Sequence, residues 1–210
     1  MDIVRNVMGA NYLETIAGFT GQGVRAEVMD AGLDITHADW STPPLLHTST
    51  GSADHGTCTY GINFANGNST PGGQSRGMMP DATGIFANYS NYGSRYTHTE
   101  QLVNPALNYR AVYQSNSWGG GRTTAYNSTS QQMDDIIFLN DFSILQSQSN
   151  AGNQDSRPEA WAKNVISVGG IRHGNDSNDA NDNWNYGASI GPAQDGRIKP
   201  DIAAYYDSVW

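Results

Sequence analysis

The chain has 210 residues, of which 37% are hydrophobic and 15% charged, a length typical of one domain with a single sizeable core. Its formal net charge of −9 disfavours a nucleic-acid partner, because phosphate binding depends on clustered Lys and Arg. The apolar runs are too short to cross a bilayer, and a lone cysteine, Cys58, excludes an internal disulfide. These features favour an acidic, soluble protein without a membrane partner.

Short apolar runs alternate along the chain with stretches of helical spacing. Strands are predicted at 24–29, 84–88, 111–116, 142–148 and 165–168. Helices are predicted in HGTCTYGINFAN, which starts at His55 with Asp54 as its cap, and near 98–110 and 128–140. This alternation predicts an α/β fold with a mostly parallel, twisted sheet and helices on both faces.

Polar segments follow three of the predicted strands. Asp30 ends the first strand, and the segments 116–119 and 150–153 follow two later ones. In open parallel sheets, sites form at the carboxyl ends of the strands. The fold is therefore expected to bring these segments to one rim of the sheet.

Seven segments carry recognisable motifs in a fixed order. They are GVRAEVMDAGLD (23–34), HGTCTYG (55–61), RGMMPDATGIFA (76–87), NSWGG (116–120), SNAGNQDS (149–156), AKNVISVGG (162–170) and ASIGPAQDGRIKPDIAA (188–204). In this order they resemble the motifs of the subtilisin-like serine proteases, the subtilase family. The resemblance implies one subtilisin-like catalytic domain over residues 1–210, represented by its N-terminal portion. The C-terminal part is interpreted as missing, because the family's G-T-S-x-A nucleophile motif does not occur before Trp210.

The resemblance implies catalytic roles for three residues. A neutral histidine can take a proton from a serine hydroxyl, while a buried carboxylate fixes its tautomer and stabilises the imidazolium. His55 would be this base and Asp30 its orienting carboxylate, and Asn153 would donate its side-chain amide to the oxyanion. Alone, Asp30 would indicate a turn, His55 a surface position and Asn153 a left-handed turn. The order of the motifs favours catalysis.

The resemblance also implies a substrate-binding surface. Ser117, Trp118 and Gly119 would offer a peptide an extended edge, with Trp118 as a wall of the pocket for the residue before the cut. Ala151 and Gly152 would belong to the same surface. The alternative for Trp118 is a plain core residue.

Cys58 lies three residues after His55 on the same helical face, where a thiol could in principle replace the serine. The base would have to reach it from the wrong side. We therefore interpret Cys58 as an inert, buried residue.

No residue is assigned as a metal ligand. The loop NDSNDANDN (175–183) contains Asp176, Asp179 and Asp182, but their spacing does not match the helix–loop–helix calcium motif, which favours a solvated loop. The histidines lack an H-E-x-x-H arrangement, so catalytic zinc is not expected. The resemblance implies structural calcium somewhere on the protein and no cofactor for the chemistry.

Two functions remain open. The first is a serine endopeptidase that acts on polypeptides, represented by a fragment without its nucleophile, and the second is a non-catalytic peptide-binding or scaffold protein with the same fold. The missing segment would leave apolar surface exposed, so we expect self-association or a complementing C-terminal chain. The resemblance also implies secretion, with the signal peptide and pro-segment outside these residues.

Overall fold

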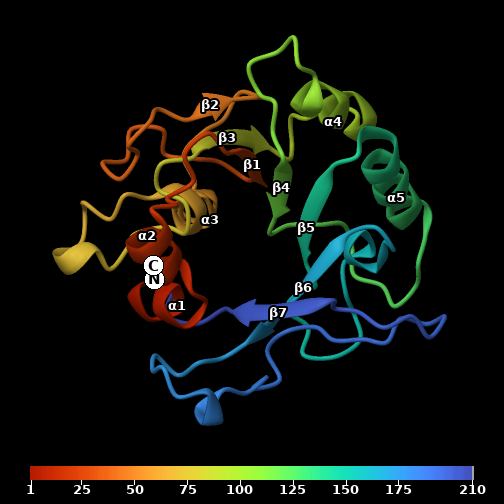
Figure 1. Ribbon diagram of the computed structural model, residues 1–210. Coiled ribbons are helices and arrows are strands. Elements are labelled where there is room, and N and C mark those ends of the chain that lie inside the picture. The colour runs from red at the N-terminus through yellow and green to blue at the C-terminus, as the bar shows by residue number, and fades with distance from the viewer. Residues whose placement is uncertain (210) are drawn as a thin grey trace.

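The computed structural model shows a parallel sheet of seven strands within its described residues, 1–209 (Figure 1). The strands are β1 (Arg25–Asp30), β2 (Leu45–Leu46), β3 (Thr83–Asn88), β4 (Tyr113–Asn116), β5 (Ser143–Ser147), β6 (Ile166–Ile171) and β7 (Ile202–Tyr205). Their order is β2-β3-β1-β4-β5-β6-β7, and every neighbouring pair is parallel. The predicted α/β class with a parallel sheet is confirmed.

Helices lie on both sides of this sheet. The α-helices are α1 (Asp2–Val7), α2 (Ala10–Ala17), α3 (Asp54–Phe64), α4 (Arg95–Val103) and α5 (Ser128–Asn140), and short 3-10 turns cover Pro71–Gly73, Pro158–Trp161 and Asp179–Asn181. Figure 1 shows α3 on one side of the central strands and α4 with α5 on the other. Within residues 1–209, no helix combines the length and the apolar character needed to cross a bilayer.

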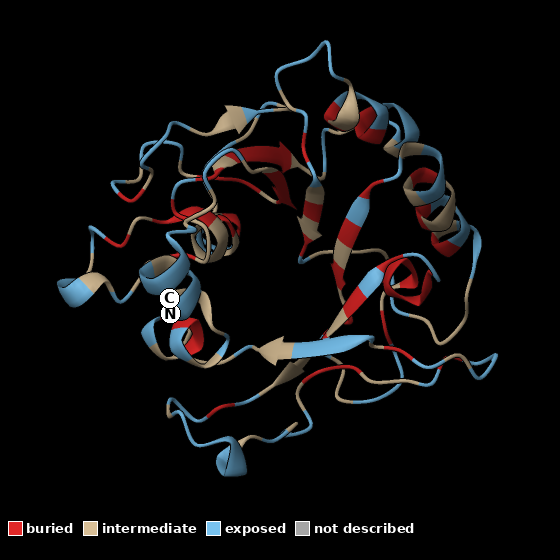
Figure 2. Cartoon of the chain, in the orientation of Figure 1, coloured by how far each residue is buried: buried red, intermediate tan, exposed pale blue. Residues whose placement is uncertain are grey.

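The side-chain alternation of β1 divides the core between the two faces. Ala26 and Val28 point to the α3 side, where they pack in one apolar cluster with Tyr60 and Phe64. Figure 2 shows this burial concentrated in the central strands and on the inner sides of the helices. By the period of two, Asp30 belongs to the α3 side of β1 and Glu27 to the opposite side.

A second apolar cluster fills the face under α4 and α5. It contains Ile85 from β3 and Ile144 from β5. The helices and adjoining loops add the other buried members: Leu102, Ala111, Met133, Ile136, Phe142, Ala162 and Val165. Deleting one such buried aliphatic side chain typically costs about 2–5 kcal/mol, so this cluster fixes where α4 lies on the sheet.

Several boundaries differ from the sequence prediction for local reasons. The prediction of Asp54 as a cap is wrong, because α3 begins at Asp54 itself after an extended Ala53, without a side-chain capping bond. Helix α4 covers Arg95–Val103 instead of 98–110, since Asn104 precedes Pro105, a position that disfavours helical backbone. The sequence prediction also missed α1, α2, β2 and β7, which are short or weakly patterned.

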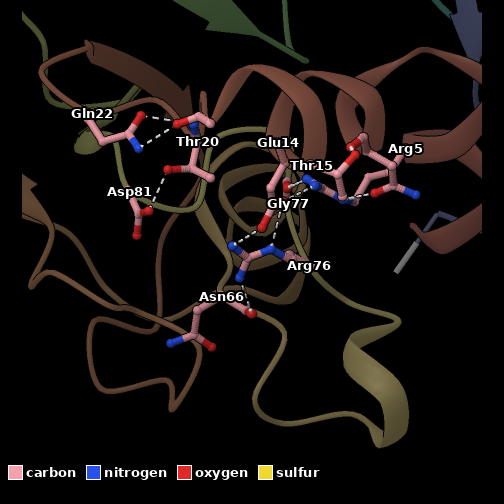
Figure 3. Close-up of polar contacts among 11 residues, drawn as sticks. Arg5, Glu14, Thr15, Thr20, Gln22, Asn66, Arg76, Gly77 and Asp81 are labelled. Atoms are coloured by element: carbon pink, nitrogen blue, oxygen red, sulfur yellow. Dashed lines mark hydrogen bonds and ion pairs between the residues drawn. The ribbon is translucent and has the colours of Figure 1, made fainter.

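Ion pairs attach the two N-terminal helices to the loop that follows α3 (Figure 3). Arg5 is 3% exposed; its guanidinium pairs with Glu14 and donates to the Gly77 carbonyl. Arg76 lies 2.8 Å from the other Glu14 oxygen, and its hydrogen bond lowers the pKa of Glu14. The Arg76–Glu14 and Arg5–Gly77 contacts join residues more than 60 positions apart, so no local pattern predicts them.

Candidate active site

Asp30 and His55 are in direct contact at the carboxyl end of β1. Nδ1 of His55 lies 2.9 Å from each carboxylate oxygen of Asp30. The Asp30 side chain is 2% exposed, whereas that of His55 is 63% exposed. A buried carboxylate thus holds one ring nitrogen, while the ring remains open to a ligand, which is the geometry expected of an orienter and a base.

Two further donors fix the Asp30 carboxylate. The backbone N–H of Ala31 donates to Oδ1 at 2.7 Å, and the Thr59 hydroxyl donates to Oδ2 at 3.1 Å. Thr59 lies four residues after His55 on α3, so one face of this helix presents both groups to Asp30. The sequence analysis missed Thr59, although its helical spacing from His55 is visible in the motif.

Two glycines allow α3 to approach the end of β1 this closely. A Cβ at Gly56 would lie 1.9 Å from the carbonyl oxygen of Gly32 and 3.1 Å from Asp30 Cβ. A Cβ at Gly32 would lie 2.4 Å from the carbonyl oxygen of Gly51. The glycines that follow Asp30 and His55 in their motifs therefore place the first turn of α3 against the β1 rim.

The segment after β4 lies at the same rim, one strand away. Asn116 ends β4 beside Met29. Between β1 and β4 the sheet has a switch point, because β3 and β2 lie on one side of it and β5, β6 and β7 lie on the other. Such a switch point is the usual place for a ligand crevice in open parallel sheets. Ser117 is exposed, while Trp118 and Gly119 are half-buried. The structure thus brings the Asp30 and Ser117–Gly119 segments to neighbouring strand ends.

Trp118 lies in an aromatic cluster. Its ring stacks on Tyr89 with centroids 5.0 Å apart, and Tyr92 lies 5.9 Å away. The Arg95 guanidinium is 5.2 Å from the Trp118 centroid and pairs with Glu159 at 2.7 Å. This cluster immobilises the Trp118 ring beside the rim, and its role as a pocket wall stays a prediction.

Asn153 is exposed in the loop after β5. Its Oδ1 accepts from the Asp155 N–H at 2.8 Å, which orients the side chain and leaves the Nδ2 group to act as a donor. The left-handed backbone in this loop occurs at Ser149 and Gly152 rather than at Asn153. Asn153 is therefore not a left-handed turn residue, but its side chain forms an Asx turn with Asp155, and its oxyanion role stays a prediction.

The neighbouring loop residues are held by the segment near 186–190. A Cβ at Gly152 would lie 2.2 Å from the Tyr186 carbonyl oxygen. The Ala151 N–H donates to Ser189 Oγ at 3.0 Å, and Ser189 donates in turn to the Asp155 carbonyl at 2.6 Å. The Ser189 hydroxyl is therefore already hydrogen-bonded within this loop, and Ser189 is only 1% exposed. Within residues 1–209, no serine hydroxyl hydrogen-bonds to His55.

The prediction that Cys58 is buried is wrong, because the residue is exposed on α3. It lines a cavity of about 410 Å³ with Asp34, Trp40 and Ile62. Partial desolvation, followed by the charge of Asp30, raises the pKa of its thiol. A raised pKa disfavours the nucleophilic thiolate, which agrees with the interpretation of Cys58 as an inert residue.

The acidic loop does not gather its carboxylates into a metal site. Asp176 accepts from the Asn178 N–H and the Asn181 amide, and Asp182 accepts from the Tyr205 hydroxyl at 2.8 Å. Among residues 1–209, the one group of three converging His, Cys or acidic side chains lies elsewhere. Calcium binding stays a prediction.

The parallel sheet and the carboxylate–histidine pair at its rim are an arrangement of the subtilisin-like type. The family model described as the subtilase family matches residues 21–207. Since this match covers most of the chain, the protein belongs to the subtilase family. A comparison with curated protein sequences gave no significant match.

Solved structures of subtilisin-like proteases share the fold. The prenylagaramide maturation protease PagA is 19% identical, with a TM-score of 0.66 over 88% of this chain and 64% of its own. The psychrophilic protease Apa1 from the Antarctic bacterium Pseudoalteromonas sp. AS-11 is 19% identical, with a TM-score of 0.60 over 87% of this chain and 43% of its own. The S41 psychrophilic protease is 18% identical, with a TM-score of 0.61 over 94% of this chain and 72% of its own. The present chain thus spans less than two thirds of PagA and less than half of Apa1.

Proposed function

We propose that the chain provides the acid–base half of a serine endopeptidase site that hydrolyses polypeptides. The observation that carries this proposal is the contact between the buried Asp30 carboxylate and the exposed His55 ring, 2.9 Å apart at the sheet rim. The family membership of residues 21–207 supports the same reaction class.

The geometry supports a specific division of labour between the two residues. With the Asp30 carboxylate accepting from Nδ1–H, the Nε2 atom of His55 carries the lone pair. This atom would take the proton of a serine hydroxyl as it attacks the peptide carbonyl, and would return it to the leaving amine. The imidazolium formed between the two steps is stabilised by the buried carboxylate.

Asn153 would stabilise the oxyanion of the tetrahedral intermediate. Its exposed side chain keeps Oδ1 engaged with Asp155 N–H, so Nδ2 can donate to a ligand. A donor of this kind is worth about 3–4 kcal/mol in the transition state. Ser117, Trp118 and Gly119 would bind the substrate as an added strand beside this group.

The alternative, a non-catalytic peptide-binding protein, is favoured by one observation: His55 meets no serine hydroxyl within residues 1–209. Activity would then require a nucleophile from a further segment. Exposed apolar side chains such as Phe138 (81%) and Leu139 (68%) support our expectation of self-association or of a complementing chain. Family membership and the acidic composition support secretion.

The decisive experiment supplies the missing nucleophile. The chain is joined to, or mixed with, a segment from its parent gene that carries the family's G-T-S-x-A motif, and cleavage of a fluorogenic peptide library is measured. We expect activity that His55→Ala abolishes, while the 210-residue chain alone shows none above that variant. His37→Ala is the matched control, because His37 contacts Trp40 and lies outside the Asp30–His55 pair. Sedimentation of the same samples tests assembly, and a compact monomer at high concentration would contradict the expected association.

Two outcomes would contradict the proposal. Turnover by the complemented protein that survives His55→Ala would remove the base from its assigned role. Robust His55-dependent turnover by the unaccompanied chain would show that another nucleophile is present. Peptide binding without cleavage by the folded, complemented protein would instead establish the binding function.

A further inference from the structure

A second carboxylate–histidine cluster lies on the opposite face of β1 from Asp30. Glu27, in the middle of β1, is 0% exposed, and His47 and His98 are each 3% exposed. His47 Nδ1 lies 2.8 Å from Glu27 Oε2, and His98 Nε2 lies 2.7 Å from Glu27 Oε1. Three parts of the fold thus meet at this buried carboxylate: strand β1, the segment after β2 and helix α4.

Amide side chains surround this cluster and fix its orientation. Gln114 on β4 donates to Glu27 Oε1 at 2.6 Å, and Gln101 Oε1 lies 3.0 Å from His47 Nε2. The two imidazole rings stack with centroids 3.9 Å apart. Around a protein-bound metal ion, hydrogen bonds of this kind orient the ligand side chains.

Such a cluster destabilises the fold unless its buried charge is compensated. Burial of a carboxylate is unfavourable, and the Ile85 side chain beside Glu27 on β3 is apolar. Both oxygens of the buried Glu27 carboxylate face an imidazole nitrogen.

We propose that Glu27, His47 and His98 bind one divalent transition-metal ion, with Zn²⁺ as the preferred ion. The ligand atoms are a carboxylate oxygen of Glu27, Nδ1 of His47 and Nε2 of His98, which lie within 4.8 Å of one another. One carboxylate and two imidazoles form a common zinc ligand set.

Metal binding requires a rearrangement of the three side chains. Zinc bonds of about 2.0–2.1 Å in tetrahedral geometry place ligand atoms about 3.3 Å apart. The contacts of 2.7 and 2.8 Å, which go to different oxygens of Glu27, must therefore open, and ligand atoms that now lie up to 4.8 Å apart must come closer. The ion takes the place of the protons between the rings and the carboxylate, and these protons are released to solvent. His47 then carries its proton on Nε2, where Gln101 Oε1 accepts it.

The site is separate from the proposed peptidase chemistry, because its ligand atoms are buried and lie on the opposite side of β1 from Asp30. Metal binding would cross-link β1, the segment after β2 and α4. Helix α4 also carries Arg95, whose guanidinium lies over the Trp118 ring. The ion would therefore hold the aromatic cluster beside the predicted substrate surface in place.

The test measures metal binding directly on the full 210-residue chain. After dialysis against a chelator, ZnCl₂ is titrated by calorimetry, and bound zinc is counted by elemental analysis after desalting. We expect one equivalent of zinc and a higher melting temperature. His47→Gln and His98→Gln should weaken binding by at least 100-fold, and Gln101→Ala by about 10–100-fold.

His173→Gln is the matched control. His173 is a buried histidine that pairs with Asp207 at 2.8 Å, but no third ligand joins that pair among the described residues. The substitution should leave zinc binding unchanged. Zinc that is not retained by the unmodified chain, or that is retained equally by all variants, would overturn the proposal.

Cobalt provides a measurement that needs no variant. Co²⁺ added to the unmodified chain should give the intense visible absorption of a tetrahedral site, and Zn²⁺ should displace it. Weak absorption typical of octahedral, water-coordinated Co²⁺ would overturn the proposal even if the histidine variants failed to fold.

Discussion

Replacing Gly56 by alanine tests how the Asp30–His55 pair is positioned. The new Cβ would lie 1.9 Å from the Gly32 carbonyl oxygen, whereas such carbon–oxygen contacts are normally about 3.3 Å or longer. The first turn of α3 must then move by more than about 1 Å, because the obstacle is backbone. We expect Gly56→Ala to destabilise the fold by about 3 kcal/mol, at the upper end of the range for overpacked sites.

Gly61→Ala is the control within the same helix. The nearest atoms to its added Cβ, in Ala65 and Trp40, are 3.8 Å away, an ordinary packing distance. Alanine is a better helix former than glycine, so this variant should gain about 0.5–1 kcal/mol. The two substitutions are chemically identical, and only the space around them differs.

Urea unfolding followed by circular dichroism measures both free energies. The ring resonances of His55 in NMR spectra report the site: they should shift in Gly56→Ala and stay unchanged in Gly61→Ala. Once the nucleophile is supplied, a displacement of about 1 Å should reduce peptidase activity by roughly 100-fold. Equal stability of the two variants, with unchanged His55 resonances, would refute this account of the rim.

Two further predictions concern α3 and the loops near it. Hydrogen bonds from Ser69 and Ser75 overcome the effect of burial and lower the pKa of Asp39 in the folded chain. The contribution of Asp39 to stability is therefore present above its unfolded pKa of about 3.9 and is lost as the pH falls through the lower folded pKa. Asp39→Asn should therefore cost about 1–3 kcal/mol in urea unfolding at pH 7, with a difference from wild type that shrinks towards pH 2; a difference independent of pH would contradict this. Because the pKa of Cys58 is raised by desolvation and by Asp30, its alkylation by iodoacetamide at pH 8 should be slower in the native chain than in urea, and equal rates would disprove the shift.

The central part of the fold could be predicted because local pattern and packing agree there. The helix at 128–140 was predicted with its observed limits, and its N-terminus carries the capping box of Asn127 and Ser130. In β3 the run of four buried residues from Gly84 to Ala87 is identified by its composition. By contrast, β2 has only two residues, and its place beside β3 is set by tertiary pairing that no local pattern contains.

The candidate site divides in the same way. Asp30 and His55 lie in motifs that contain Gly32 and Gly56, and these glycines are required for the close contact between the two segments. The motifs therefore indicate the contact. Cys58 is interpreted from the sequence as an inert, buried residue that His55 would have to reach from the wrong side, whereas its position on α3 leaves it exposed. Glu27, His47 and His98 lie in three distant segments, and only the folded chain brings their side chains together.

The two carboxylates of β1 differ in the exposure of the histidines that they contact. Glu27 and Asp30 are three residues apart, so strand alternation sends them to opposite faces. Both are buried and both accept from imidazole nitrogens. His55 is 63% exposed and can meet a substrate, whereas His47 and His98 are each 3% exposed and can exchange only a proton or a small ion. The exposure of the histidine, rather than the burial of the acid, is therefore the reason for placing the proposed reaction on one face of the strand and the proposed metal binding on the other.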